Sequence, residues 1–266
     1  MKSNIPPGKV RASAKTIFVT GTDTGVGKTL LTALVLHHLR RTGCHALAMK
    51  PFCSGGRGDV KLLNSLQNCE LLTEEINPFY FVEPIAPLIA ARMHGRNVSL
   101  NEVLDRVRKL KSKCDWLVIE GSGGLLVPLG EGYTVLDLMM RLGCPVVVVA
   151  RNRLGVLNHT LLTIKAMQAV GIKSIAVVLM SCYERDTSAQ TNEQTLTELL
   201  SPIGVLNIPF LGEGALRPAA IKRNYKKIKK TVALLADFDS FTRVLLNDSQ
   251  KRLETKSSVD SPRGRK

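Results

Sequence analysis

The chain is 266 residues long, 44% hydrophobic and 22% charged, and its formal net charge is +15. This composition is that of a globular protein, and no apolar run approaches the ~20 residues of a membrane-spanning helix. The six cysteines are scattered and form no close CxxC pair, which argues against a zinc site and against a disulfide framework. We expect a cytoplasmic protein without membrane association.

The positive charge is concentrated at the two ends of the chain. Residues 1–15 contribute +4, and residues 217–266 hold 14 Lys and Arg against 5 Asp and Glu. Such runs usually form solvated faces or tails, and they lack the interleaved aromatic residues of single-strand binders. We predict a basic arm at 1–15, one domain at 16–246 that ends in a helix from 231 to 246, and a disordered basic tail at 247–266. Nucleic-acid binding is not expected as a primary role.

Apolar runs alternate with helical patterns along the chain. Continuous apolar runs predict strands at 16–20, 45–50, 115–120, 145–150 and 174–180. Helices are predicted at 29–40, after the capping box at 99–102, at 134–142 and at 156–170. Continuous apolar strands are typical of a parallel sheet covered on both faces. We therefore predict an α/β fold: a single domain with a mainly parallel sheet and helices on both faces, which the glycine-rich loop before Lys28-Thr29 makes P-loop NTPase-like. Trp116, Met139 and Met140 are expected in its core.

Polar or glycine-rich loops follow four of the predicted strands. Thr20 precedes a glycine-rich loop, Lys50 precedes "PFCSGGRGD", Glu120 precedes "GSGG" and Ala150 precedes "RNRLG". In open α/β sheets, ligands bind beyond the carboxyl ends of the strands. We expect the chemistry of this protein at that edge of the sheet.

The first of these loops, within "FVTGTDTGVGKT" at 18–29, resembles a phosphate-binding loop. The usual pattern is G-x-x-x-x-G-K-[ST], whereas five residues separate Gly21 from Gly27 here. The end of the loop is intact and opens a helix directly after a strand, so its backbone N–H groups can surround a phosphate. Lys28 is expected to reach the β and γ oxygens, and Thr29 to bind Mg²⁺.

Two acids and a second lysine complete the predicted site. Mg²⁺ usually takes one or two carboxylates, and Asp59 and Glu120 follow strand ends. Spacing alone also allows Glu120 to cap nearby backbone and Asp59 to be a helix N-cap. Lys50 would bring a second cation to the phosphates, where it could stabilise a transferring phosphoryl group; alternatively it is the exposed end of a strand.

With these residues assembled, the chain resembles the dethiobiotin synthetases from about Thr16 to Glu213. The resemblance rests on segments in register: the extended phosphate loop, "MKPFCSGG", "EGSGGLLVPL", "RLGVLNHTLLTIKA" and "NIPFLGE". It implies a ligase that phosphorylates the carbamate formed from 7,8-diaminononanoate and CO₂ at the expense of ATP, and closes the dethiobiotin ring from the resulting anhydride. The residues that it implies for the nucleotide are Asp23, Thr24, Gly25, Val26, Gly27, Lys28, Thr29, Glu120, Ser181 and Pro209.

The same resemblance implies roles for the remaining site residues. Lys28 and Lys50 are expected to act in catalysis, and Thr29, Asp59 and Glu120 to hold Mg²⁺. Substrate would bind to Thr24, Ser54 and Lys50 of one subunit. In a homodimer, the partner subunit would complete the substrate site with its own copies of Leu154, Gly155 and Asn158.

Three positions depart from the pattern of the family. Gly25 stands where many members have a glutamate, and Ser122 replaces an alanine. Ser181 stands where an asparagine often reads adenine, so a serine would make one contact in place of two.

Two other functions stay open on the sequence. A nucleotide-gated ATPase of the partition or septum-site type could bind DNA or membrane through the basic tail, although many of those ATPases carry a lysine at the position of Asp23. A related ligase acting on another substrate is the third possibility.

Overall fold

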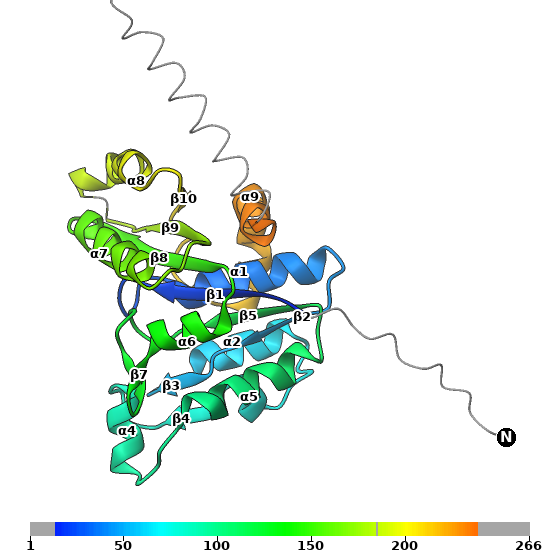
Figure 1. Cartoon of the computed structure of the whole chain (residues 1–266). Helices are drawn as coiled ribbons and strands as arrows, with labels where there is room; N and C mark the ends of the chain where they lie inside the picture. Colours follow the sequence, from blue (N-terminus) through cyan, green and yellow to red (C-terminus); the bar gives the residue numbers. More distant parts are fainter. Residues whose placement is uncertain (1–13, 185, 239–266) are drawn as a thin grey trace, which may run out of the picture.

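The computed structural model describes residues 14–184 and 186–238 (Figure 1). Its strands are β1 (Lys15–Gly21), β2 (Ala46–Met49), β3 (Phe52–Ser54), β4 (Phe79–Phe81), β5 (Trp116–Glu120), β6 (Pro128–Gly130), β7 (Tyr133–Thr134), β8 (Val146–Asn152), β9 (Ile175–Ser181) and β10 (Gly204–Ile208). Its helices are α1 (Lys28–Arg41), α2 (Gly58–Leu66), α3 (Thr73–Ile76), α4 (Pro87–Met93), α5 (Leu100–Lys111), α6 (Val135–Leu142), α7 (Val156–Ala169), the 3₁₀ helix η1 (Thr187–Gln190), α8 (Asn192–Leu200) and α9 (Pro218–Ala236).

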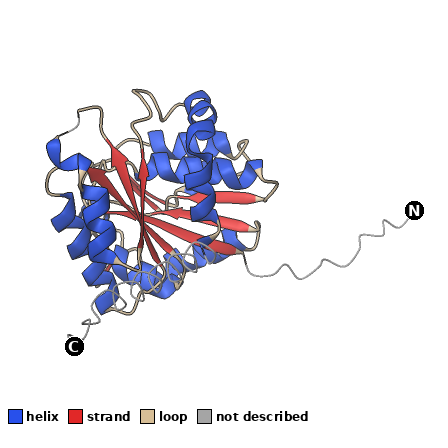
Figure 2. Ribbon diagram, turned by 90° about the horizontal axis from the view of Figure 1, so that it is seen from above, coloured by secondary structure: helices blue, strands red, loops and turns tan. Residues whose placement is uncertain are grey.

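Six strands form one parallel sheet in the order β10-β9-β8-β1-β5-β2. Helices cover both of its faces (Figure 2), and the apolar residues of β1, β5, β8 and β9, except the partly buried Trp116, are buried between the layers. The predicted α/β fold with a mainly parallel sheet is therefore confirmed. Within the described ranges, no helix is long and apolar enough to cross a membrane.

The register of the sheet brings the predicted strand ends together. β1 lies between β5 and β8, and β5 pairs with β2 on its other side. Met49 is opposite Ile119 in the β2–β5 pair, so the next residues along, Lys50 and Glu120, emerge side by side. Val19 is opposite Glu120 in the β1–β5 pair, which places the loop after β1 directly beside them.

The last described helix differs from its prediction. The helix expected from 231 begins at Pro218 and runs to Ala236, and the rest of the predicted range lies largely outside the described residues, as do residues 1–13 of the predicted arm and the whole tail. The basic run within "IKRNYKKIKK" belongs to this helix. Its apolar face is buried at Ile221, Tyr225, Ile228, Val232 and Leu235, while its lysines are exposed.

One predicted core residue is on the surface. Met139 is buried, but Met140 is 44% exposed, so the prediction for Met140 is wrong. Adjacent residues of a helix point about 100° apart, and α6 turns only the side of Met139 toward the core. Trp116 is partly buried and packs against the core.

Candidate nucleotide-binding and active site

The phosphate loop connects β1 to α1 through a left-handed turn. Gly27 is the N-cap of α1, with φ 105°, a conformation that side chains other than glycine rarely adopt. A Cβ atom at this position would lie 3.0 Å from Cγ of Met180. The first turn of α1 contains no acidic residue, so its free N–H groups and its dipole favour an anion.

Lys28 folds back along this loop. Its Nζ donates a hydrogen bond of 2.7 Å to the carbonyl oxygen of Asp23, and the side chain is 7% exposed. Burial lowers the pKa of Lys28 to about 8; Lys50 acts in the same direction, while Glu120 opposes the shift. A phosphate beside this ammonium would favour its charged form.

Glu120 ends β5 and is fully buried. Its Oε1 accepts hydrogen bonds from Oγ1 of Thr29 at 2.7 Å and from Nζ of Lys50 at 2.9 Å. Its Oε2 is buried and has no hydrogen-bond partner among the described residues. The carboxylate thus joins the first turn of α1 to the end of β2, and one of its oxygens stays available for a cation.

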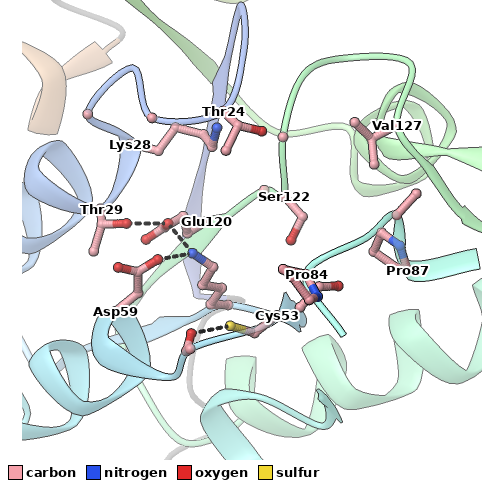
Figure 3. Close-up of a pocket in the computed structure, with 18 of the residues that line it drawn as sticks. Thr24, Lys28, Thr29, Cys53, Asp59, Pro84, Pro87, Glu120, Ser122 and Val127 are labelled. Atoms are coloured by element: carbon pink, nitrogen blue, oxygen red, sulfur yellow. Dashed lines mark hydrogen bonds and ion pairs between the residues drawn. The ribbon is translucent and has the colours of Figure 1, made fainter. Parts of the chain in front are cut away.

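Lys50 links the two candidate metal-binding carboxylates. The Nζ atom bonds to both Glu120 and Asp59, and Figure 3 shows these two acids and Thr29 close together below the phosphate loop. Burial works to lower the pKa of Lys50, but Glu120 and Asp59 outweigh it and raise the pKa above its ordinary value. The lysine is 8% exposed, so the alternative of an exposed strand end is wrong.

The structural alternatives for the two acids also fail. Asp59 lies in the first turn of α2, whose N-cap is Arg57 and has no side-chain cap hydrogen bond. The carboxylate of Asp59 bonds to Lys50. For Glu120, the two hydrogen bonds described above go to side chains. Neither acid serves as a backbone cap.

A cavity of about 720 Å³ opens beside this cluster. Ser54, at the end of β3, lines it, and Oγ of Ser54 is buried without a hydrogen-bond partner among the described residues. Thr24, Lys28, Thr29, Lys50, Asp59 and Glu120 line the same cavity. The facing wall comes from the segment of Pro84 and Pro87 (Figure 3).

A second cavity, of about 730 Å³, lies on the other side of the loop. It shares Gly25 and Gly27 with the first, and Ser181 and Pro209 line it. The predicted nucleotide-binding residues are therefore divided between two adjoining cavities, except for Asp23, which lines only a small third cavity. The aromatic rings of Tyr183 and Phe210 also line the second cavity, with their centroids 5.6 Å apart.

The segment 154–158 does not join the substrate cavity of its own chain. Leu154 is 80% exposed, Gly155 is the left-handed N-cap of α7, and Asn158 is exposed. Leu154 lines a small cavity with Asp23 and Thr24, but none of the three residues lines the cavity that contains Ser54.

Sequence reasoning missed several groups that fix these loops. Asn77 donates from its side chain to the carbonyl oxygen of Lys50 at 2.9 Å, and Ser122 donates to that of Phe52 at 2.6 Å. Asp186 accepts from the backbone N–H of Leu154 at 2.7 Å. Each contact spans distant parts of the sequence, so no local pattern predicts it.

This fold and loop define the class of the protein: a P-loop NTPase-like protein. Among solved structures, a putative plasmid partition protein from Borrelia burgdorferi bound to AMPPNP matches with a TM-score of 0.53 and 12% identity, over 82% of this chain and 99% of that one. A ParA family ATPase from Chlorobium tepidum matches with a TM-score of 0.50 and 14% identity, over 81% and 92%. At these identities the likeness concerns the fold alone.

Sequence comparisons define the family more narrowly. The model of a family described as "AAA domain" matches residues 15–213. An ATP-dependent dethiobiotin synthetase from Bacillus licheniformis is 38% identical over 203 residues, covering 74% of this chain and 84% of the relative. One from Anaeromyxobacter dehalogenans is 39% identical over 210 residues, covering 77% and 94%. The chain belongs to the dethiobiotin synthetase family, a family of ligases, and the resemblance predicted from its motifs is confirmed.

Proposed function

We propose that the chain is an ATP- and Mg²⁺-dependent cyclo-ligase that converts 7,8-diaminononanoate and CO₂ to dethiobiotin in biotin biosynthesis. The observation that carries the proposal is the cluster of Thr29, Lys50, Asp59 and Glu120 below the phosphate loop, in a chain that belongs to this family. The route runs through a carbamate and a carbamic–phosphoric anhydride.

The donor set fits Mg²⁺. No group of three His, Cys, Asp or Glu side chains in the described ranges could hold a metal ion, but Mg²⁺ commonly takes one or two carboxylates together with substrate phosphates. Thr29, Asp59 and Glu120 would hold it, the last through its unpartnered Oε2. Bound Mg²⁺ would offset the negative charge of the phosphate oxygens.

The charges of the site suit the attack of a carbamate on a triphosphate. Both reactants are anions, so they need fixed cations between them. Lys28 lies in the loop that would surround the β-phosphate, and Lys50 is held at the end of β2 by two carboxylates. We assign Lys50 to the transferring phosphoryl group and the hydroxyl of Ser54, which has no partner among the described residues, to the carbamate.

We further propose that two chains share each substrate site. The segment 154–158 lies outside the cavity of its own chain, and 80% of the surface of Leu154, just before α7, and 59% of that of Leu162, within α7, is exposed. A partner's copy of this segment would bring the N-terminal turn of α7, without acidic residues, to the substrate carboxylate.

The activity is tested by incubating the protein with 7,8-diaminononanoate, bicarbonate, Mg²⁺ and ATP and detecting dethiobiotin by mass spectrometry. Lys28→Ala should abolish the product, whereas Lys61→Ala, at an exposed position of α2, should not. Absence of product with every nucleoside triphosphate would refute the proposal.

The shared site is tested by mixing two inactive variants. Lys28→Ala and Asn158→Ala each remove one half of the site, so a mixed dimer contains one intact site. Mixing them should restore part of the activity. No recovery after subunit exchange, in variants that remain dimeric, would contradict the shared site.

A further inference from the structure

Three polar side chains are joined by consecutive hydrogen bonds beside the second cavity. Ser181, the last residue of β9, donates from Oγ to Oδ1 of Asn207 in β10 at 3.0 Å. Asn207 in turn donates from Nδ2 to Oε2 of Glu193, in the first turn of α8, at 3.1 Å. All three are partly buried, and Ser181 lines the cavity.

The direction of these hydrogen bonds follows from the chemistry of each group. A carboxylate only accepts hydrogen bonds, so Glu193 requires the NH₂ group of Asn207 on its side. The carbonyl oxygen of Asn207 then faces Ser181, and that oxygen also only accepts. The single hydroxyl proton of Ser181 is therefore used within the protein. What Ser181 presents to the cavity is an oxygen that accepts hydrogen bonds and does not donate them.

We propose that Glu193 and Asn207 are positioning residues that make Ser181 a reader of exocyclic amino groups, so that the site selects adenine over 6-oxopurines. This inference rests on the proposed function and places the base of ATP in the second cavity, which adjoins the phosphate loop at Gly25 and Gly27. The 6-amino group of adenine donates a hydrogen bond to Ser181. The 6-oxo group of hypoxanthine or guanine meets the serine lone pairs instead and is left unpaired, which disfavours it.

The surroundings of Ser181 suit a base. Tyr183 and Phe210 line the same cavity, 5.6 Å apart, and are 82% and 40% exposed. Aromatic rings at the mouth of a cavity bind the faces of purines with little regard to their substituents. The rings would therefore supply affinity for any purine. The hydrogen bonds that link Glu193, Asn207 and Ser181 would make the site select adenine among the purines.

The test compares the affinities of ADP and IDP by calorimetry, since these nucleotides differ at the 6-position and hypoxanthine has no amino group. The wild type should prefer ADP by about tenfold, the typical effect of one well-made hydrogen bond. Asn207→Leu frees the hydroxyl of Ser181 to donate, and should bring the ratio close to one. Glu193→Gln, in α8, allows the side-chain amide of Asn207 to rotate. It should lower the ratio of ADP to IDP affinity without any substitution in β10.

The double variant Asn207→Asp with Glu193→Gln is the matched control. It exchanges amide and carboxylate, so an acceptor still faces Ser181 and the preference for ADP should return. Equal affinities for ADP and IDP in the wild type, or an unchanged ratio in Asn207→Leu, would overturn the inference while leaving the proposed ligase intact. Failure to bind either nucleotide would overturn both.

Discussion

Nζ of Lys50 lies 2.9 Å from Oε1 of Glu120, and the parallel register of β2 and β5 sets this pair. Met49 and Ile119 are opposite each other, so the two charged residues leave the sheet together. Asp59 approaches the same ammonium from α2. One cation thus offsets two carboxylates, of which Glu120 is buried and Asp59 is partly exposed, and this arrangement makes the cluster sensitive to any change of charge.

Lys50→Met should destabilise the protein and make its stability depend on Mg²⁺. Two carboxylates lose their cation, and removing one member of a buried ion pair typically costs about 3–5 kcal/mol. Added Mg²⁺ should stabilise the variant more than the wild type, because it replaces the missing charge, while dethiobiotin formation stays lost. Thermal unfolding with and without Mg²⁺ measures this. Equal gains in the two proteins would contradict a cation site at this cluster.

Substitutions of two serines near the cavity should have different effects, one on turnover and the other on stability. Ser54→Ala removes a hydroxyl without a described partner, so the free energy of unfolding should hardly change while turnover falls. Ser122→Ala leaves the carbonyl oxygen of Phe52 without its 2.6 Å donor and should cost about 1 kcal/mol, with little loss of turnover. Urea unfolding and steady-state kinetics of both variants check this, and the opposite pattern would remove Ser54 from the site.

Replacing either loop glycine should weaken nucleotide binding, but to different degrees. Gly25 has φ 74° and open space around it, whereas Gly27 has φ 105° and Met180 close to its missing side chain. Gly25→Ala should therefore reduce the free energy of ADP binding by about 1–2 kcal/mol, and Gly27→Ala should reduce it by more. Calorimetry with ADP measures both. Combining Gly27→Ala with Met180→Ala should recover part of the loss, and a milder effect at Gly27 than at Gly25 would be inconsistent with this geometry.

The stability of the protein should fall below about pH 6.5, the ordinary pKa of histidine. Burial, and then the cations Arg41 and Lys222, lower the pKa of His37, and burial lowers that of His38. The unfolded chain then binds more protons, so stability is fully present above the ordinary pKa and is lost as the pH falls through the lower folded-state values. Urea unfolding at several pH values measures this.

The control for this pH dependence is a variant with both histidines changed to glutamine. Its free energy of unfolding should change less than that of the wild type between about pH 8 and pH 5.5, a range chosen around the histidine pKa. A wild type that becomes more stable on acidification, or a double variant with the full wild-type slope, would show that these histidines are not the cause.

The lysines of α9 should be dispensable for folding and catalysis. Lys226→Ser and Lys227→Ser change exposed positions and should alter stability by no more than about 0.5 kcal/mol. Ile228→Ala, on the buried face of the same helix, should cost about 2–5 kcal/mol. Urea unfolding and turnover provide the comparison. A loss of function in the lysine variants alone would favour the partition-type alternative, in which basic residues hold DNA or membrane.

The sequence predicts the fold well where one local pattern is sufficient. The apolar runs and the loop before Lys28 identify the strands and the first helix, and the rule of strand ends predicts that Lys50 and Glu120 lie at one edge. The start of α9 is harder to predict, because six lysines and arginines on its outer face conceal the apolar spacing of Ile221, Tyr225 and Ile228. The residues that form a basic run in the sequence occupy only the exposed face of this helix.

The candidate site was only partly predictable. The contact of Ser181 with Asn207 depends on the register of β9 and β10, in which Leu179 is opposite Asn207, and no spacing in the sequence gives that register. The same holds for Ser122 and Phe52. The strand-end rule predicts which residues lie at this edge of the sheet, whereas the hydrogen bonds between side chains of distant loops follow only from the register and packing of the elements.

The packing of α9 on α1 has a consequence for the order in which the protein is made. Tyr225 bonds through its hydroxyl to Nδ1 of His38 at 2.8 Å, on the same helix that begins with Lys28 and Thr29. On the ribosome, α1 is synthesised long before α9, the helix that covers it. A nascent chain therefore carries its phosphate loop on an uncovered helix until α9 has emerged, and it should become able to retain nucleotide only after that point.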